Sequence, residues 1–228
     1  MTSSSSNVVE PTDSEISNGS LLVLVVDVNP DQRAFLCKPV SRLTQWLDSG
    51  LALVNSHLLL HPANDVAVVA ASKRSCKFLY PDVSQLHSTP SEQLVRTSSA
   101  HDGQFEGFEE IENVIRKRAH SMIVGEMQES GQPFVAQDSL ITGGLCMALS
   151  YINRRNKDMQ LDTLSDKASK DEGTSKHSSA LNKETHGSQN TLRSRILVMT
   201  ASGSTSAQYM SYMNAFFTAQ VRQLTGLS

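Results

Sequence analysis

Three polar side chains that follow the most apolar stretch of the sequence are its first candidates for chemistry. An unbroken apolar run covers residues 21–26, and after it come, at alternate positions, Asp27, Asn29 and Asp31. Carboxylate and amide oxygens are hard ligands of the kind that Mg²⁺ prefers in proteins. The same side chains also accept hydrogen bonds from nearby backbone amides, which stabilises turns and helix starts. The residue types therefore leave two interpretations, a cation site and a structural turn.

The apolar run predicts where these side chains lie. Six consecutive apolar residues cannot alternate between core and solvent, so both faces of the segment must be buried. This pattern is typical of a central strand in a mostly parallel sheet that is covered by helices. The three polar residues would then stand at the carboxyl end of the strand, the edge at which open α/β sheets bind their ligands.

Apolar periodicity and turn residues predict the other elements. Helices are expected over about 31–60, 105–127, 137–153 and 207–221, and further strands over 65–71, 76–80 and 194–200. Pro39 should either kink the first helix or mark its true start. The strands on either side of residues 73–75 must be antiparallel, because a parallel return needs a crossover of about a dozen residues or more. The expected class is a layered α/β fold whose mixed sheet has one antiparallel edge strand.

Three polar segments are expected to lie outside this framework. Residues 1–20 are Ser-rich and acidic and are predicted to be a disordered leader, and residues 82–103 are predicted to be a surface loop. Residues 154–192 are rich in Ser, Lys, Asp and Thr and are predicted to be a disordered insertion before the last strand. The folded domain is therefore expected over residues 21–228, with this insertion inside it.

Composition narrows the class of protein. Of the 228 residues, 39% are apolar and 19% are charged, and the net charge of -3 disfavours a nucleic-acid-binding polycation. No stretch is typical of a signal peptide or reaches the roughly 18 apolar residues of a membrane span, so a soluble intracellular protein is expected. The three cysteines form no CxxC pair, which disfavours a zinc ribbon or a disulfide framework and fits a reducing compartment.

The other chemical motifs are weak. His57 and His61 stand four positions apart, a spacing that zinc sites use, but no third ligand is evident and an ordinary helix face is expected. Residues 142–144 read Thr-Gly-Gly, yet no Lys follows with the spacing of a phosphate-binding loop. Cys146 is expected to be a small buried side chain of a helix. No Ser/His/Asp or Cys/His arrangement has a supporting local signature, so no catalytic residue is predicted.

The order of these features resembles the von Willebrand factor A-like domain. Shared features are a polar turn with two acids after the first strand, a long helix, an antiparallel strand pair and a later strand that ends in Thr. More specific segments are LVLVVDVNP at 22–30, VNSHL at 54–58, FLYP at 78–81, SRILVM at 194–199 and QYMSYMN at 208–214. In this order, over roughly residues 21–220, they resemble the family of von Willebrand A-like third subunits of general transcription and DNA repair factor IIH (TFIIH).

This resemblance implies a three-layer α/β/α, Rossmann-like fold and a nuclear, non-enzymatic scaffold of the TFIIH core, which serves RNA polymerase II initiation and nucleotide excision repair. It implies contacts with other core subunits, above all the one with a zinc-binding RING-like module, and no sequence-specific nucleic-acid or membrane binding. The family also has a C-terminal zinc-binding module and further sheet strands, from which residues 221–228 depart. A C-terminally incomplete domain without a cofactor of its own is therefore expected. Residues 196–199 would be an apolar edge that is prone to self-association.

The resemblance also bears on the polar turn. An adhesion-type metal site in this fold uses an acid and two hydroxyl residues here, a Thr from a second loop and an Asp after the fourth strand. In this sequence Asn29 and Asp31 replace the hydroxyls, and no Asp follows the fourth strand. The second-loop hydroxyl would come from Thr142 or Ser139.

We therefore expect a degenerate site at Asp27, Asn29, Asp31 and Thr142 that acts as a structural turn and binds no metal. The alternative function is a metal-dependent adhesion-type domain that binds an acidic ligand through Mg²⁺. The surface that binds a partner is not predicted.

Overall fold

Strands and helices follow one another in the predicted order. The computed structural model describes residues 19–32, 35, 38–82, 104–128, 138–170, 192–203 and 206–225. Its elements are β1 (Ser20–Asp27), α1 (Pro39–Leu60), β2 (Asp65–Ala71), β3 (Cys76–Tyr80), α2 (Gln104–Gln128), α3 (Ile141–Lys170), β4 (Arg193–Met199), a short 3₁₀ helix (Ser206–Gln208) and α4 (Tyr209–Thr225). Within the described ranges, no helix is long and apolar enough to cross a bilayer. The predictions for residues 1–18, 83–103 and 171–191 lie outside the described residues.

In the described part of the chain, β1 lies inside a four-stranded mixed sheet with the strand order β3-β2-β1-β4. It runs parallel to both of its neighbours, and β3 is antiparallel to β2 at the sheet edge, as predicted. Val23 pairs with Ala67 of β2 on one side and with Ile196 of β4 on the other. All apolar residues of β1 are buried except Leu22, which is partly exposed. The apolar run therefore forms a central strand, because it has neighbours on both edges and cores on both faces.

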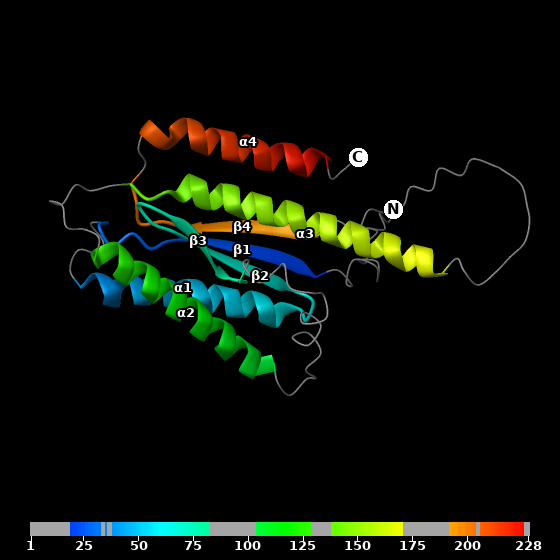
Figure 1. Cartoon of the computed structure of the whole chain (residues 1–228), viewed down its shortest axis with the longest axis horizontal. Helices are drawn as coiled ribbons and strands as arrows, with labels where there is room; N and C mark the ends of the chain where they lie inside the picture. The colour runs from blue at the N-terminus through cyan, green and yellow to red at the C-terminus, as the bar shows by residue number, and fades with distance from the viewer. Residues whose placement is uncertain are drawn as a thin grey trace, which may run out of the picture.

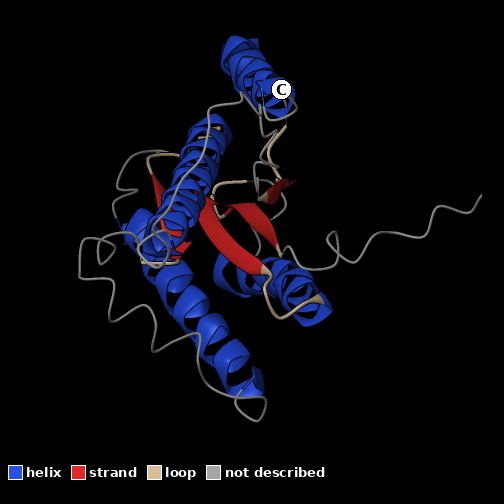
Figure 2. Cartoon of the chain, turned by 90° about the vertical axis from the view of Figure 1, so that its right-hand side faces the viewer, coloured by secondary structure: helices blue, strands red, loops and turns tan. Residues whose placement is uncertain are grey.

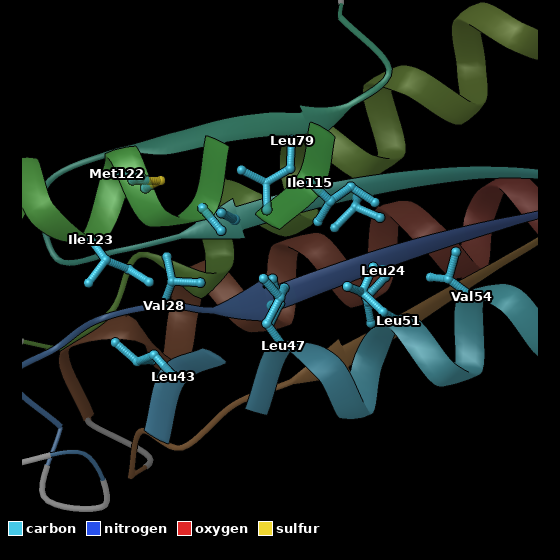
Figure 3. Close-up of a cluster of buried hydrophobic side chains, with 14 of the residues drawn as sticks. Leu24, Val28, Leu43, Leu47, Leu51, Val54, Leu79, Ile115, Met122 and Ile123 are labelled. Carbon is cyan, nitrogen blue, oxygen red and sulfur yellow. The ribbon is translucent and has the colours of Figure 1, made fainter. Parts of the chain in front are cut away.

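Helices cover both faces of the sheet and make the predicted three-layer α/β/α fold. α1 and α2 lie on one face, and α3 and α4 lie on the other (Figures 1 and 2). Side chains of β1 alternate between two cores: Leu24 packs with Leu43 and Ile115 on the α1 and α2 side (Figure 3), and Val23 packs toward Tyr151 of α3. Each fully buried Leu, Ile or Val contributes about 1.5–3 kcal/mol, so these two cores are the main source of stability.

The first helix begins at Pro39 rather than at residue 31. Pro39 lies in the first turn of α1, where a missing backbone N–H costs no hydrogen bond. Lys38 before it has a φ of 63° and does not cap the helix with its side chain. Of the two roles predicted for Pro39, the start of the helix is therefore confirmed.

α3 is much longer than expected. The predicted disordered insertion from residue 154 is wrong as far as Lys170, where α3 ends. No Gly or Pro occurs between residues 145 and 172, so nothing in the sequence interrupts a helix whose first turns are anchored on the sheet. The guanidinium of Arg155 also pairs with the carboxylate of Asp65 at 2.8 Å, which ties this polar part of the helix to the start of β2.

A glycine allows α3 to lie close to the sheet. A Cβ atom on Gly144 would stand 2.7 Å from Cγ1 of Val25, closer than real Cβ atoms approach. The first turn of α3 therefore packs directly on β1. This contact brings Ser139, just before α3, to the carboxyl end of β1.

Candidate functional site: the cluster around Asp27

The buried carboxylate of Asp27 is the centre of a hydrogen-bonded cluster. Asp27 is the last residue of β1 and has no exposed surface. Its Oδ1 accepts hydrogen bonds from the backbone N–H of Asn29 at 3.1 Å and from the hydroxyl of Ser139 at 2.7 Å. Its Oδ2 accepts from three donors of the segment after β4, which are the hydroxyls of Thr200 and Ser202 and the backbone N–H of Ala201.

The sheet topology explains why these donors meet. β1 and β4 are parallel neighbours, so Asp27 and the segment that contains Ser202 leave the sheet at the same edge. The close packing of α3 on β1 adds Ser139 to this edge. The hydroxyl oxygens of Ser202 and Ser139 also lie 2.8 Å apart, so the two side chains are in contact beside the carboxylate. Three segments far apart in the sequence are thereby joined at one carboxylate.

Ser139, not Thr142, is the second-loop hydroxyl of this cluster. Ser139 is buried, and its Oγ also accepts from the amide of Gln32 at 3.2 Å. Its backbone carbonyl accepts from Nε2 of Gln208 at 3.0 Å. Thr142 lies in the first turn of α3, half-buried, and makes no hydrogen bond to Asp27. The choice depends on where α3 begins, which sequence spacing left open.

Asn29 and Asp31 form the turn that follows β1. Oδ1 of Asn29 accepts from the backbone N–H of Asp31 at 3.1 Å, which is the turn-stabilising bond that the structural interpretation requires. The carboxylate of Asp31 pairs with the ammonium of Lys73 at 2.5 Å, and the Lys73 side chain is only 6% exposed.

Sequence reasoning missed three members of this cluster. Lys73 lies in the turn between β2 and β3, where a lysine is ordinarily solvated. Thr200 and Ser202 follow the fourth strand, where sequence reasoning considered only the missing Asp and did not assign their hydroxyls to the cluster. The available signal was topological: β2 and β4 both run parallel to β1, so the residues after each strand meet at one edge.

These residues do not fit a bound Mg²⁺. The ion requires free oxygen lone pairs at about 2.0–2.1 Å in near-octahedral geometry. Both oxygens of Asp27 already accept from protein donors, and Asp31 faces the positive charge of Lys73, which repels a cation. Across the described residues, no group of three or more His, Cys, Asp or Glu is placed to hold a metal ion. The chemistry that the cluster can perform is to fix the loops at this edge of the sheet.

The two histidines have separate structural roles. His57 is buried on α1, and its Nε2 lies 3.1 Å from the backbone carbonyl of Ser20. His61 follows the end of α1, and its Nδ1 accepts from the backbone N–H of Ala63 at 3.1 Å. Each ring therefore already bonds to nearby backbone, which supports the ordinary interpretation of the pair.

Of the two cysteines that the structure describes, Cys76 lacks the features of a nucleophile. The thiol of Cys76 donates to the carbonyl of Leu140 at 3.1 Å, and burial raises the pKa of this thiol. A raised pKa lowers the fraction of reactive thiolate. Cys146 is exposed, so the prediction of a buried side chain is wrong: it lies on the solvent side of α3.

Two surface hollows lie elsewhere on the domain. One, of about 380 Å³, follows α2 beside Glu109 and Lys117. The other, of about 310 Å³, lies where β3 meets α3 and is lined by Phe78, Met147 and Tyr151 among others. Neither hollow includes a residue of the Asp27 cluster, so neither presents a substrate to it.

The layers, strand order and polar edge together define an α/β domain of the von Willebrand A-like class. The chain is similar to a solved structure described as the crystal structure of the TFIIH p34 N-terminal domain. The TM-score is 0.56 and the sequence identity 24%, over 89% of this chain and 76% of that chain. At this identity the likeness shows the fold.

The sequence comparison shows the family. The family model described as Transcription factor Tfb4 matches residues 19–225, so the chain belongs to the Tfb4 family. It is 29% identical over 212 residues to general transcription and DNA repair factor IIH subunit TFB4 of Eremothecium gossypii, covering 88% of this chain and 53% of the relative. It is 27% identical over 209 residues to the subunit tfb4 of Schizosaccharomyces pombe, covering 90% and 55%. The chain thus spans about half the length of the curated relatives it matches.

Proposed function

We propose that this chain is a non-catalytic subunit of the TFIIH core that acts through protein–protein contacts in transcription initiation and nucleotide excision repair. The observation that carries the proposal is the family match over residues 19–225, with relatives named as TFIIH subunits. Because the chain spans about half of those relatives, the proposal concerns the role of the A-like domain in the complex. The proposed location is the nucleus, and the proposed partners are other core subunits, above all the RING-bearing one.

The site geometry supports a non-catalytic role. A catalytic carboxylate needs an accessible oxygen that can reach a substrate. Asp27 is fully buried and accepts from donors on both oxygens, and the ammonium of Lys73 is held by Asp31. The cluster therefore stabilises the edge of the sheet, and the proposed activity lies on the outer surface of the helices.

Co-purification tests this proposal. The tagged full chain is expressed in its source cells, recovered from nuclear extract and examined by mass spectrometry. We expect the other core TFIIH subunits to be enriched over a tag-only control. Recovery of the folded chain without any TFIIH subunit would overturn the proposal.

Matched variants map the binding face in the same experiment. Leu60 of α1 is 80% exposed, Met127 of α2 is 42% exposed and Phe217 of α4 is 55% exposed. Leu60→Lys, Met127→Lys and Phe217→Lys each place a charge on a different helix with little effect on the core. The variant that loses the subunits identifies the face, and the other two serve as its controls. Circular dichroism verifies that all three are folded.

Calorimetry with Mg²⁺ tests the alternative of a metal-dependent adhesion-type domain. We expect no saturable heat when MgCl₂ is titrated into the purified chain, because the oxygens of Asp27 are engaged by protein donors. A tight, saturable site that Asp31→Asn removes and Asp158→Asn retains would favour the adhesion-type alternative. Asp158 lies on the polar part of α3 and is the matched surface acid.

A further inference from the structure

Two cysteines from different elements lie close together where α3 crosses β3. Cys76 is the first residue of β3 and is partly buried, whereas Cys146 lies in the second turn of α3 and is exposed. Burial raises the pKa of the Cys76 thiol, and the nearby thiol of Cys146 adds to this rise. The two thiols are therefore near enough to influence one another, although they are 70 positions apart in the sequence.

Gly143 leaves the space between the two thiols open. A Cβ atom on Gly143 would stand 3.0 Å from Sγ of Cys76, so the first turn of α3 lies directly against this sulfur. Cys146 follows Gly143 by three positions and therefore shares its face of the helix. Side chains of a helix point back toward its N-terminus, so the Cys146 side chain leans toward the turn that contains Gly143. The glycine places no side chain between the sulfurs.

Contacts on both sides of this crossing fix its geometry. The thiol of Cys76 donates to the carbonyl of Leu140, just before α3, at 3.1 Å. Two positions further along β3, the ring of Phe78 lies 5.5 Å from that of Tyr151. Cys146 stands between these two contacts along α3 and lines, with Phe78, the hollow of about 310 Å³. The helix is thus held against β3 on either side of Cys146, and small molecules in solvent can reach its thiol.

We propose that Cys76 and Cys146 form a redox-active dithiol, a modification site that hydrogen peroxide converts into a reversible disulfide between β3 and α3. Disulfides join residues whose Cα atoms are about 4.4–6.8 Å apart, and the close approach at Gly143 brings helix and strand together at this point. In a reducing compartment such a bond is transient, unlike the bonds of a structural disulfide framework. This inference is independent of the proposed role in TFIIH.

The exposed thiol reacts first. The thiolate of Cys146 attacks one oxygen of hydrogen peroxide and the O–O bond breaks, which gives a sulfenic acid and a hydroxide that takes up the thiol proton as water. The thiolate of Cys76 then attacks the sulfenic sulfur, and the S–O bond breaks. The departing hydroxide takes the Cys76 proton as a second water. Two thiols thereby lose two electrons, and one peroxide gains them.

The two cysteines have different roles in this sequence of steps. The raised pKa of Cys76 leaves little thiolate to react with peroxide in solution. It suits Cys76 to the second step, which is intramolecular and in which the fold supplies the proximity. A small dithiol such as dithiothreitol reverses the bond by thiol–disulfide exchange.

Peptide mapping tests the dithiol. The reduced full chain is exposed to a small excess of hydrogen peroxide, free thiols are blocked with N-ethylmaleimide, and a non-reducing digest is examined by mass spectrometry. The chain has three cysteines, so Cys37 is the competing thiol. We expect the main disulfide within one chain to link Cys76 to Cys146 and to disappear with dithiothreitol. Cys37→Ser is the matched control and keeps the link.

Further variants separate the steps. Cys76→Ser leaves Cys146 without a resolving thiol, so a sulfenic acid should accumulate at Cys146 and react with dimedone. Cys146→Ser removes the first step, so Cys76 should stay reduced under the same exposure. Gly143→Ala inserts a Cβ against the Cys76 sulfur and should slow the link several-fold. Gly125→Ala on α2, where a Cβ has nothing within 4 Å, should leave the rate unchanged.

Three results would overturn the proposal. A folded wild-type chain that forms no link between Cys76 and Cys146 has no such dithiol. The same selectivity for this pair in urea would show that the fold does not bring the thiols together. A Gly143→Ala chain that links at the wild-type rate contradicts the path over the glycine. Circular dichroism of each variant verifies that loss of the link is not loss of the fold.

Discussion

At the scale of the residue, Asp27 accepts hydrogen bonds on both oxygens from backbone and hydroxyl donors of three chain segments. All of these partners donate, so both oxygens of the Asp27 side chain act as acceptors. The same position that could hold a cation in an adhesion-type site is here surrounded by protein donors. Its role can be tested by exchanging one oxygen for a donor.

Asp27→Asn is expected to destabilise the fold by about 3 kcal/mol, because an amide nitrogen would face buried donors and the charge-assisted bonds would be lost. Ser202→Ala removes one donor and leaves the others, so it should cost about 1 kcal/mol. Urea unfolding at neutral pH measures both. Equal stability of Asp27→Asn and wild type would show that the cluster does not hold the loops.

Tyr151 should make stability depend on alkaline pH. Its ring packs 5.5 Å from that of Phe78, and burial, followed by the negative charge of Asp65, raises the pKa of its hydroxyl. The unfolded chain, with a Tyr pKa of about 10, then loses this proton first. The stabilisation is present below pH 10 and is lost as the pH rises above it.

Tyr151→Phe removes this contribution. Between pH 8 and pH 11, wild type is expected to lose more unfolding free energy than the variant, as measured by urea denaturation at each pH. Parallel losses in the two proteins would mean that the Tyr151 hydroxyl does not titrate differently in the folded state.

The spacing of Asp27, Asn29 and Asp31 was enough to predict that they are neighbours, because three alternate polar residues directly after a strand must lie at its end. It could not choose between Ser139 and Thr142, since that choice depends on the first residue of α3. The burial of Lys73 could not be predicted for another reason. It results from the contact of Lys73 with Asp31 at the sheet edge, and that contact depends on the strand order.

At the scale of the element, α3 is held against the sheet by a close approach at Gly144. Gly144→Ala would force the helix away from Val25 and is expected to cost about 1–3 kcal/mol by overpacking. Gly125→Ala on α2 is the matched control, because a Cβ there has nothing within 4 Å and helix propensity should give a gain of about 1 kcal/mol. Thermal unfolding of the two variants measures both, and a loss at Gly125 equal to that at Gly144 would contradict the packing argument.

Most elements were predictable because their apolar periods are strong. β2 and β3 have the predicted bounds, and α1 begins at the proline that the sequence singled out. The end of α3 was not predictable from composition, because a polar segment without Gly or Pro satisfies the rules of a loop and of a solvated helix equally well. The ion pair between Arg155 and Asp65 is a tertiary contact that composition does not report.

At the scale of the whole molecule, the fold class and the Tfb4 family membership agree with the resemblance that the strand and helix segments indicated. The resemblance rested on the order of several short segments between residues 22 and 214, because no single segment is specific to the family. A chain that is held in TFIIH should be found in a large complex, and a free chain should be found near the mass of the chain alone.

Gel filtration of nuclear extract tests the proposed function most directly. The native chain is followed by immunoblot alongside another core TFIIH subunit, in fractions calibrated by mass. We expect the two to co-elute in a large complex, far above the 24.9 kDa of the chain alone. Elution of the entire pool at one or two times that mass, apart from the other TFIIH subunit, would contradict the proposal that the chain is a TFIIH subunit.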